Sequence, residues 1–123
     1  MRIGEVAQRA GVTPRTIRHY ESLGLLSPGE RQGHGHHYYS EETVARLTKI
    51  DQLKRLGLSL EEIGEVIDLY FSDPSGVQPK QKVLVMLREH LAESERRLGE
   101  LQQFRDELRA HIGHFERFLE AVG

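Results

Sequence analysis

Residues 11–26 read GVTPRTIRHYESLGLL, and this stretch predicts the turn and the second helix of a helix-turn-helix. Gly11 suits the left-handed turn that ends a short helix. Thr13 is a good N-cap, and Pro14 fits the first helical position because the N–H that proline lacks is not needed there. The second helix is therefore predicted over residues 14–23.

The side chains of this helix divide between two faces. Ile17 and Tyr20 are spaced to face a core, whereas Arg15 and Arg18, three residues apart, share another face. The major groove of DNA admits an α-helix, and the arginine fork matches guanine O6 and N7. Hydroxyls near a helix N-terminus bond phosphate or touch a base edge, which here concerns Thr13 and Thr16. A solvated basic face is the alternative interpretation.

Further helices are predicted on both sides of this stretch. Apolar residues at helical spacing predict a first helix over residues 3–10. A third helix is expected between the N-cap Ser40 and the closing Gly57. The pattern of Ser59 followed by Glu62 is a capping box that opens a fourth helix.

The segment between the second and third helices predicts a β-hairpin. One strand is expected near 25–27, a tip from Gly29 to Gly35, and a return strand near 37–39. A loop with Arg31 near one end and Tyr39 at the other, beside a helix-turn-helix, is the layout of a winged helix. Phosphate contacts from such a wing position a protein on DNA without reading the bases.

The C-terminal part predicts one long helix with a heptad repeat from about residue 79 to 121. With Leu84 as the first a position, ten of the twelve a and d positions are apolar, and Arg105 and Ser94 are the exceptions. A helix of about 40 residues spans about 60 Å, which residues 1–72 are too few to cover, so a second copy of the chain is the expected partner. An intramolecular core helix is the alternative. The predicted dimerisation residues are Leu84, Leu87, Leu91, Leu98, Leu101, Leu108, Ile112, Phe115 and Leu119.

Composition and charge limit the class of protein. The 123 residues are 37% hydrophobic and 29% charged, and no run is apolar enough to span a membrane, so we expect a cytoplasmic protein. Residues 1–57 carry a net charge of +3 and residues 58–123 a net charge of −5, which hints at a nucleic-acid partner for the N-terminal half. The absence of cysteine excludes thiolate-bound metals and iron–sulfur clusters. No nucleophile–base pair or cofactor fingerprint indicates an enzyme.

Residues 1–70 resemble the DNA-binding domain of MerR-type transcription regulators. The resemblance rests on Ile3–Ala7, Gly11–Thr13, Thr16–Glu21, Gly24–Leu26, Pro28, Arg31, Tyr39-Ser40 and Leu56–Ile63. It implies that Arg15 and Arg18 meet bases and phosphates, and that Tyr20, Arg31 and Tyr39 contact the DNA backbone. It also implies an antiparallel pairing of the long helices, and a regulator that distorts promoter DNA to realign the elements read by RNA polymerase.

The wing departs from the family pattern at His37, which stands where a backbone-binding arginine is expected. A neutral imidazole can donate one hydrogen bond to phosphate, and a protonated imidazole can also pair with it. We therefore expect DNA affinity to rise as the pH falls from about 8 to about 6.

The effector is left open by the sequence. His34, His36 and His37 in the wing, or His111 and His114 with Glu107, could hold a metal ion, although a polar loop and a solvated helix face are the favoured interpretations. Tyr70, Phe71, Phe104 and Phe115 could line an apolar ligand site, although such residues are more often core. No cofactor is predicted.

The sequence thus predicts a mainly α protein with three parts. They are a winged helix-turn-helix DNA-binding domain with a small β-hairpin wing (residues 1–72), a linker (73–78), and a long antiparallel coiled-coil dimerisation helix (79–123). The predicted function is sequence-specific regulation of transcription by a homodimer on a palindromic promoter operator. A protein–protein adaptor and a non-specific DNA binder are the alternatives.

Overall fold

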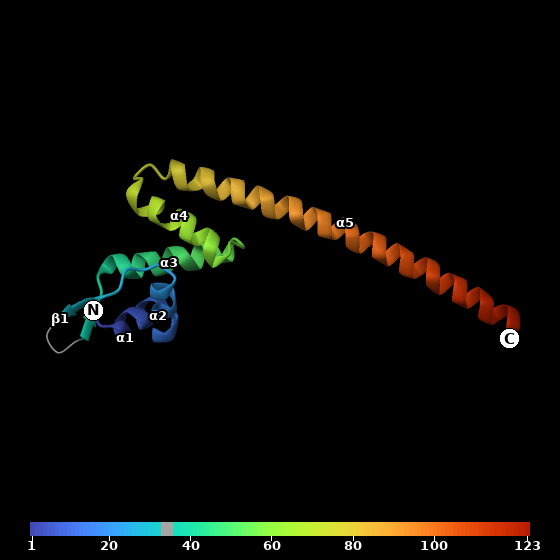
Figure 1. Cartoon of the computed structure of the whole chain (residues 1–123), viewed down its shortest axis with the longest axis horizontal. Coiled ribbons are helices and arrows are strands. Elements are labelled where there is room, and N and C mark those ends of the chain that lie inside the picture. Colours follow the sequence, from blue (N-terminus) through green and yellow to red (C-terminus); the bar gives the residue numbers. More distant parts are fainter. Residues whose placement is uncertain (33–35) are drawn as a thin grey trace. The chain divides into compact units, whose positions relative to one another are not determined.

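The computed structural model describes the backbone of residues 1–32 and 36–123 and the side chains of residues 1–29 and 37–123 (Figure 1). The elements in chain order are α1 (Ile3–Ala10), α2 (Pro14–Ser22), β1 (Glu30–Gln32), β2 (His36–Tyr38), α3 (Glu41–Arg55), α4 (Leu60–Ser72) and α5 (Val77–Val122). The chain divides into two units, Met1–Leu87 and Arg88–Gly123. None of the described helices is long and apolar enough to cross a membrane.

The helix-turn-helix forms as its local signals predict. α1 ends at Gly11, whose φ of 72° lies in the left-handed region that glycine adopts without strain. The Thr13 side chain accepts a hydrogen bond from the Thr16 backbone N–H at 3.1 Å, and Pro14 opens α2. α2 ends at Ser22, one residue before the predicted end.

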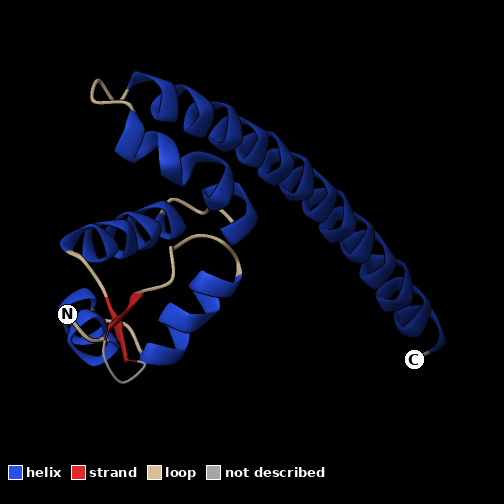
Figure 2. Ribbon diagram, turned by 60° about the vertical axis from the view of Figure 1, so that its left-hand side comes forward, coloured by secondary structure: helices blue, strands red, loops and turns tan. Residues whose placement is uncertain are grey.

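The wing is a two-stranded antiparallel hairpin in which Glu30 lies opposite Tyr38 and Arg31 opposite His37 (Figure 2). The predicted first strand at 25–27 is wrong, because Leu25 and Leu26 are buried in the core and the first strand is β1. The return strand β2 begins and ends one residue earlier than predicted. Residues 33–35 of the predicted tip lie outside the described residues.

The starts of α3 and α4 differ in their capping. Ser40 is the N-cap of α3, but its side chain makes no capping hydrogen bond, contrary to the expected role. Ser59 and Glu62 form the predicted capping box, with hydrogen bonds of 3.2 Å and 2.9 Å between the backbone of each residue and the side chain of the other. This box stabilises the first turn of α4.

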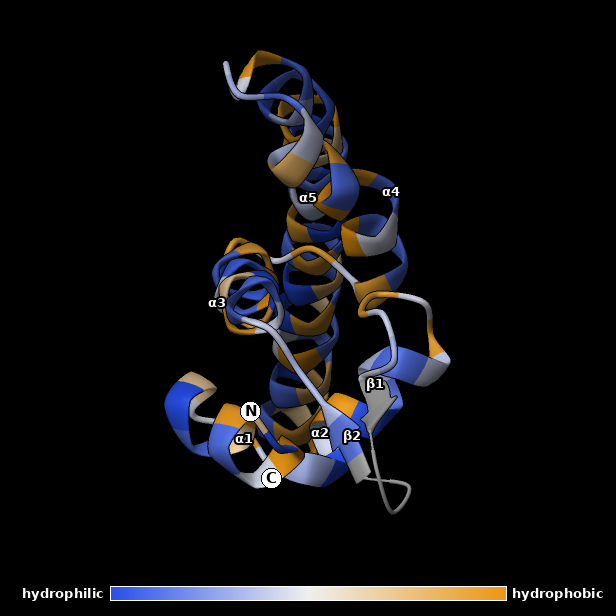
Figure 3. Ribbon diagram, turned by 90° about the vertical axis from the view of Figure 1, so that its left-hand side faces the viewer, coloured by the Kyte–Doolittle hydropathy of each residue, from blue (hydrophilic) through white to orange (hydrophobic). Residues whose placement is uncertain are grey.

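The core of the first unit draws apolar side chains from all five helices and from the segments between them. α3 and α4 alternate hydrophobic and hydrophilic residues along their length, as expected for helices that bury one face (Figure 3). No buried side-chain nitrogen or oxygen among the described residues lacks a hydrogen-bond partner. The core residues are Val6, Ala7, Ile17, Tyr20, Leu25, Leu26, Tyr39, Leu47, Ile50, Leu53, Leu58, Ile63, Val66, Ile67, Val83 and Met86.

α5 begins at Val77, two residues before the predicted start, because Asp73 organises its first turn. The Asp73 carboxylate accepts hydrogen bonds from the Ser75 hydroxyl at 2.7 Å and from the Gln78 backbone N–H at 2.9 Å. These two hydrogen bonds lower the pKa of Asp73. The beginning of α5 then buries Val83 and Met86 in the first unit.

Candidate nucleic-acid interface

α2 presents two arginines on a helix whose other face is buried. Ile17 and Tyr20 lie in the core, with 0% and 6% of their surfaces exposed, and they fix the rotation of the helix. Arg15 and Arg18 are exposed. Neither guanidinium makes a hydrogen bond or an ion pair with any side chain that the structure describes. Both donor forks are therefore available to a ligand of opposite charge.

Arg9 and Arg46 of the first unit are each paired with a carboxylate on another helix. Arg9 holds Glu41 through two hydrogen bonds of 2.6 Å and 2.8 Å. Arg46 bonds Asp68 at 2.9 Å and lies over the Phe71 ring. These pairs hold the helices to one another. Arg15 and Arg18 on α2 differ, because neither has such a partner among the described side chains.

The N-terminus of α2 adds two hydroxyls. The Thr13 oxygen accepts the capping hydrogen bond, and it lies 3.0 Å from the Thr16 hydroxyl. One of these two hydroxyls donates its hydrogen to the other. The hydrogen of the second hydroxyl remains available to a phosphate. A helix N-terminus favours negative charge, so this end of α2 suits a DNA backbone group.

The ring of Tyr20 lies in the core, as its spacing from Ile17 predicts, and it holds α2 in place. The Tyr20 hydroxyl makes no hydrogen bond to a described residue, and no buried oxygen among the described side chains lacks a partner, so this hydroxyl reaches solvent. The contact with the DNA backbone that the resemblance implies for Tyr20 stays a prediction.

Tyr39 joins the wing to α2. Its ring is buried, and its hydroxyl donates a hydrogen bond of 2.5 Å to the Glu21 carboxylate. Burial, and then the hydrogen bond to Glu21, raise the pKa of Tyr39 to about 12. Because the hydroxyl hydrogen is used by Glu21, Tyr39 positions the wing. The contact with the DNA backbone that the resemblance implies for Tyr39 stays a prediction.

The backbone of Tyr39 is held as firmly as its side chain. Its N–H donates to the Met1 carbonyl at 2.6 Å, and the Met1 amino group donates to the Tyr39 carbonyl at 3.0 Å. The sequence did not predict this pairing with Met1 or the role of Glu21. Residues 38 positions apart carry no local signal of their contact.

His37 is oriented by the base of the wing. Its Nδ1 lies 2.8 Å from the Gly29 carbonyl oxygen, so Nδ1 carries the hydrogen. In the neutral ring Nε2 is then an acceptor, which cannot donate to phosphate. The expected hydrogen bond from a neutral imidazole is therefore wrong, and only the protonated ring can serve a phosphate through Nε2.

Gly29 is a second feature that the sequence did not predict. A Cβ atom at this position would lie 2.9 Å from the His37 Cβ, from the Tyr38 backbone carbonyl oxygen and from the Tyr39 ring. Glycine is needed here so that the two sides of the wing can approach. The backbone of Arg31 lies in β1, and its side chain lies outside the described residues, as do those of His34 and His36.

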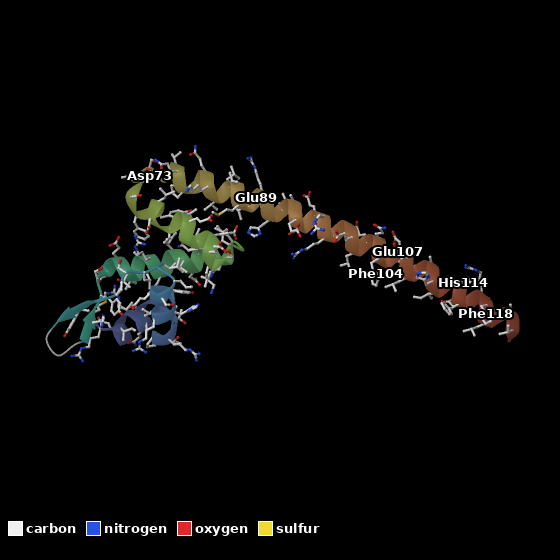
Figure 4. All side chains as sticks on the ribbon, in the orientation of Figure 1. Asp73, Glu89, Phe104, Glu107, His114 and Phe118 are labelled. Carbon is white, nitrogen blue, oxygen red and sulfur yellow. The ribbon has the colours of Figure 1, made fainter. Side chains whose placement is uncertain are left out.

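The residues considered for a metal site on α5 do not form a cluster of three ligands. Within the part of the chain that the structure describes, no three His, Cys, Asp or Glu side chains lie close enough to hold a metal ion, and this includes the set of Glu107, His111 and His114. Figure 4 shows Phe104, Glu107 and His114 spread along α5. The Tyr70 ring lies 4.5 Å from the Lys49 ammonium.

The predicted dimerisation residues lie on α5, and most of them are exposed. In the second unit Leu91, Leu98, Leu101, Leu108, Ile112, Phe115 and Leu119 are 44% to 64% exposed. Leu84 is 45% exposed. Leu87 differs, because it is half-buried and packs against the core of the first unit.

These features together define a winged helix-turn-helix DNA-binding domain. They are a helix with two exposed arginines (α2), a core that holds this helix, and a hairpin (β1 and β2) that is anchored beside it. The family model for MerR HTH regulatory proteins matches residues 1–69, and a second model, MerR, DNA binding, matches residues 44–111. The chain belongs to the MerR family of helix-turn-helix regulators. The predicted family is confirmed, as is the predicted mainly α winged helix-turn-helix fold with a long C-terminal helix.

Individual relatives agree with this assignment. The chain is 35% identical to an uncharacterized HTH-type transcriptional regulator of Pseudomonas aeruginosa, over 93% of this chain and 84% of the relative. It is 38% identical to the HTH-type transcriptional regulator CueR of Salmonella typhi, over 89% and 78% of the two chains. The crystal structure of PbrR691 from Ralstonia metallidurans CH34 in complex with lead(II) is similar, with a TM-score of 0.72, 30% identity, and coverage of 88% of this chain and 82% of that chain.

Proposed function

We propose that this protein is a homodimer that binds a palindromic promoter operator in a sequence-specific manner and regulates transcription there. The observation that carries the proposal is the pair of exposed arginines, Arg15 and Arg18, which have no partner among the described side chains and lie on the helix that Ile17 and Tyr20 hold in the core. A helix held in this way can enter a major groove without changing its orientation in the domain. Each well-formed arginine–guanine contact favours guanine over another base by about 1–3 kcal/mol.

The wing supplies the contacts that position each domain on the DNA. Tyr39 ties the end of the wing to Glu21 at the C-terminal end of α2. α2 and the wing therefore move as one body. A contact of α2 with a base in the groove is then coupled to a contact of the wing with a neighbouring phosphate. Two such bodies acting together can bend and untwist a promoter, with the deformation energy offset by backbone contacts. RNA polymerase at that promoter is the proposed second partner.

The second unit supplies the dimer. In the second unit the stripe of apolar residues on α5 is exposed, and monomeric proteins rarely expose so long a contiguous apolar surface. A homodimer with two-fold symmetry explains why the operator should be a palindrome. The protein then acts in the cytoplasm by binding DNA, without a catalytic step and without a resident cofactor.

Selection of bound sequences from a random DNA pool tests this function. The purified protein is used at about 150 mM salt, where non-specific binding is suppressed. We expect a palindromic consensus. Enrichment without a consensus would identify a non-specific binder, and no enrichment would favour a protein–protein adaptor.

Two arginine variants test directly whether α2 contacts the bases. Arg15→Ala and Arg18→Ala should each cost about 1–3 kcal/mol of binding free energy and relax the preference at one base pair of each half-site. Arg55→Ala is the matched control, because it removes the same charge from α3, where Arg55 pairs with Asp51. Binding measured by fluorescence anisotropy should be unchanged within about threefold for the control. Equal effects from all three variants would contradict base reading by α2.

A further inference from the structure

A pocket of about 430 Å³ lies at the base of the wing, and none of the contacts described above uses it. Its walls come from the segment that enters the wing (residues 26–29), the segment that leaves it (residues 38–40) and the first turns of α3. The volume falls in the range of about 300–1,000 Å³ that is usual for small-molecule sites. A ligand in this pocket would contact both sides of the wing and the helix beside it.

Four hydroxyl groups that line this pocket have no partner among the described residues. Those of Tyr38 and Thr43 are on half-buried residues, and the other two belong to Ser27 and Ser40. The Thr48 hydroxyl, one turn further along α3, differs because it donates to a backbone carbonyl at 3.1 Å. Each hydroxyl can both donate and accept a hydrogen bond, so the pocket offers a cluster of mixed donors and acceptors.

The charged groups of the pocket are balanced. The Glu42 carboxylate lies 3.7 Å from Nε of Arg46, and the same guanidinium donates to Asp68 at 2.9 Å. The Met1 amino group donates to the Tyr39 carbonyl at 3.0 Å. An anion would therefore meet a guanidinium that already has two carboxylates, together with the repulsion of Glu42. A cation would meet Arg46 and the Met1 amino group. A neutral ligand avoids both costs.

We propose that this pocket binds a neutral polyhydroxylated molecule of the size of a mono- or disaccharide, and that the molecule is an effector of operator binding. Sugar hydroxyls exchange hydrogen bonds with the four hydroxyls of the pocket, and the Glu42 carboxylate can accept two more. The C–H surface of a sugar packs on Leu26 and Pro28, which also line the pocket. A purely apolar ligand fits less well, because it would cover these hydroxyls without giving them partners.

The position of the pocket couples it to DNA binding. The wing is held from one side by the hydrogen bond from Tyr39 to Glu21. A ligand that bridges Ser27 and Thr43 would hold the other side of the wing to α3. Because less of the freedom of the wing is then lost when it contacts phosphate, the ligand should strengthen operator binding. Coupling of this kind usually amounts to about fivefold or more in affinity, and it is reciprocal. The inference rests on the function proposed above and names its regulation.

Titration of the isotope-labelled protein with sugars, followed by the NMR signals of its backbone amides, tests the site. The probes are ribose, glucose, galactose, myo-inositol, sucrose and maltose, each added to about 50 mM so that millimolar binding is detected. We expect saturable shifts from at least one probe, concentrated in residues 26–29 and 38–46. The absence of such shifts with all six probes, or shifts centred elsewhere, overturns the proposal. Inorganic phosphate is titrated in parallel, and saturation of the pocket by phosphate alone also overturns it.

Hydroxyl deletions test the contacts. Thr43→Val and Tyr38→Phe each remove one hydroxyl with little change in size, and each should weaken binding of the sugar about threefold or more. Thr48→Val is the matched control, since it makes the same substitution on α3 outside the pocket, and it should leave sugar binding unchanged. Urea unfolding of each variant reports that the chain is folded. Equal sugar affinities for the two pocket variants and the control would overturn the assignment.

Operator titrations separate this inference from the proposed function. Binding of the selected operator is measured by fluorescence anisotropy without sugar and at a saturating concentration of the sugar that binds. A dissociation constant lowered about fivefold or more supports the effector role. An unchanged or raised constant, in a chain that binds both partners, overturns that role. A chain that binds no operator without sugar or with it contradicts the proposed function itself.

Discussion

Replacing Tyr39 by phenylalanine tests whether the wing is held by its hydrogen bond to α2. The substitution removes the hydroxyl whose 2.5 Å hydrogen bond reaches Glu21 and leaves the buried ring in place. A hydrogen bond to a charged acceptor contributes about 1.5–3 kcal/mol to stability. Because Glu21 is only half-buried and can regain water, we expect a loss of about 1.5–2 kcal/mol from the free energy of unfolding.

The pH dependence gives an independent check on the same group. The pKa of Tyr39 is raised to about 12 in the folded chain, so folding favours the neutral phenol. Its contribution is fully present below pH 10, the pKa of an ordinary tyrosine, and is lost as the pH rises through about 12. The rise of the Tyr39 pKa from 10.0 to about 12 sets an upper bound of about 2.7 kcal/mol on this contribution to the free energy of unfolding. The stability difference between the original chain and the Tyr39→Phe variant should therefore shrink between pH 10 and pH 12.

Urea unfolding at a series of pH values measures both effects. Tyr38→Phe is the matched control, because the Tyr38 hydroxyl makes no hydrogen bond to a described residue, and it should change stability by less than about 0.5 kcal/mol. Operator affinity should also fall for Tyr39→Phe, because the wing loses its attachment to the recognition helix. If Tyr39→Phe matches Tyr38→Phe in stability at pH 8, the argument that this hydrogen bond anchors the wing is refuted.

Two further expectations follow from local contacts. Ser59→Ala removes one half of the capping box at the start of α4 and should lower the free energy of unfolding by about 1 kcal/mol in the same urea titration, whereas Ser40→Ala, at a cap without a side-chain hydrogen bond, should cost less. Operator affinity should rise as the pH falls from about 8 to about 6, because only protonated His37 can donate from Nε2 to phosphate, and the His37→Arg variant should lose this dependence. Anisotropy titrations at constant ionic strength measure the second effect, and an identical pH response of the two chains would count against it.

The helix boundaries of this protein were predictable because their signals are local. Gly11, Pro14 and the capping box at Ser59 act on backbone groups within four residues, so the sequence places these helix ends to within a residue or two. The start of α5 was placed two residues late, because Asp73 reaches forward to the backbone of Gln78. That reach requires a particular turn conformation, which residue types alone do not specify.

The strands of the wing were less predictable. Leu25 and Leu26 have the apolar character of a strand, yet both are in the core. β1 is instead formed by Glu30, Arg31 and Gln32, which have weak strand propensity and pair because the chain returns opposite them. Pairing between strands is set by tertiary contacts more than by intrinsic preference.

Local spacing in the sequence predicts the helix that faces DNA, since the positions of Ile17 and Tyr20 leave Arg15 and Arg18 on an exposed face, and it predicts the apolar stripe of α5. How the wing is held depends on contacts between distant residues. The fold brings Glu21 and Met1 to Tyr39, uses the Tyr39 hydroxyl hydrogen on Glu21, and commits the His37 Nδ1 hydrogen to the Gly29 carbonyl. Periodicity reports which face of a helix is buried, whereas a hydrogen bond between distant residues depends on where the whole chain places its two ends.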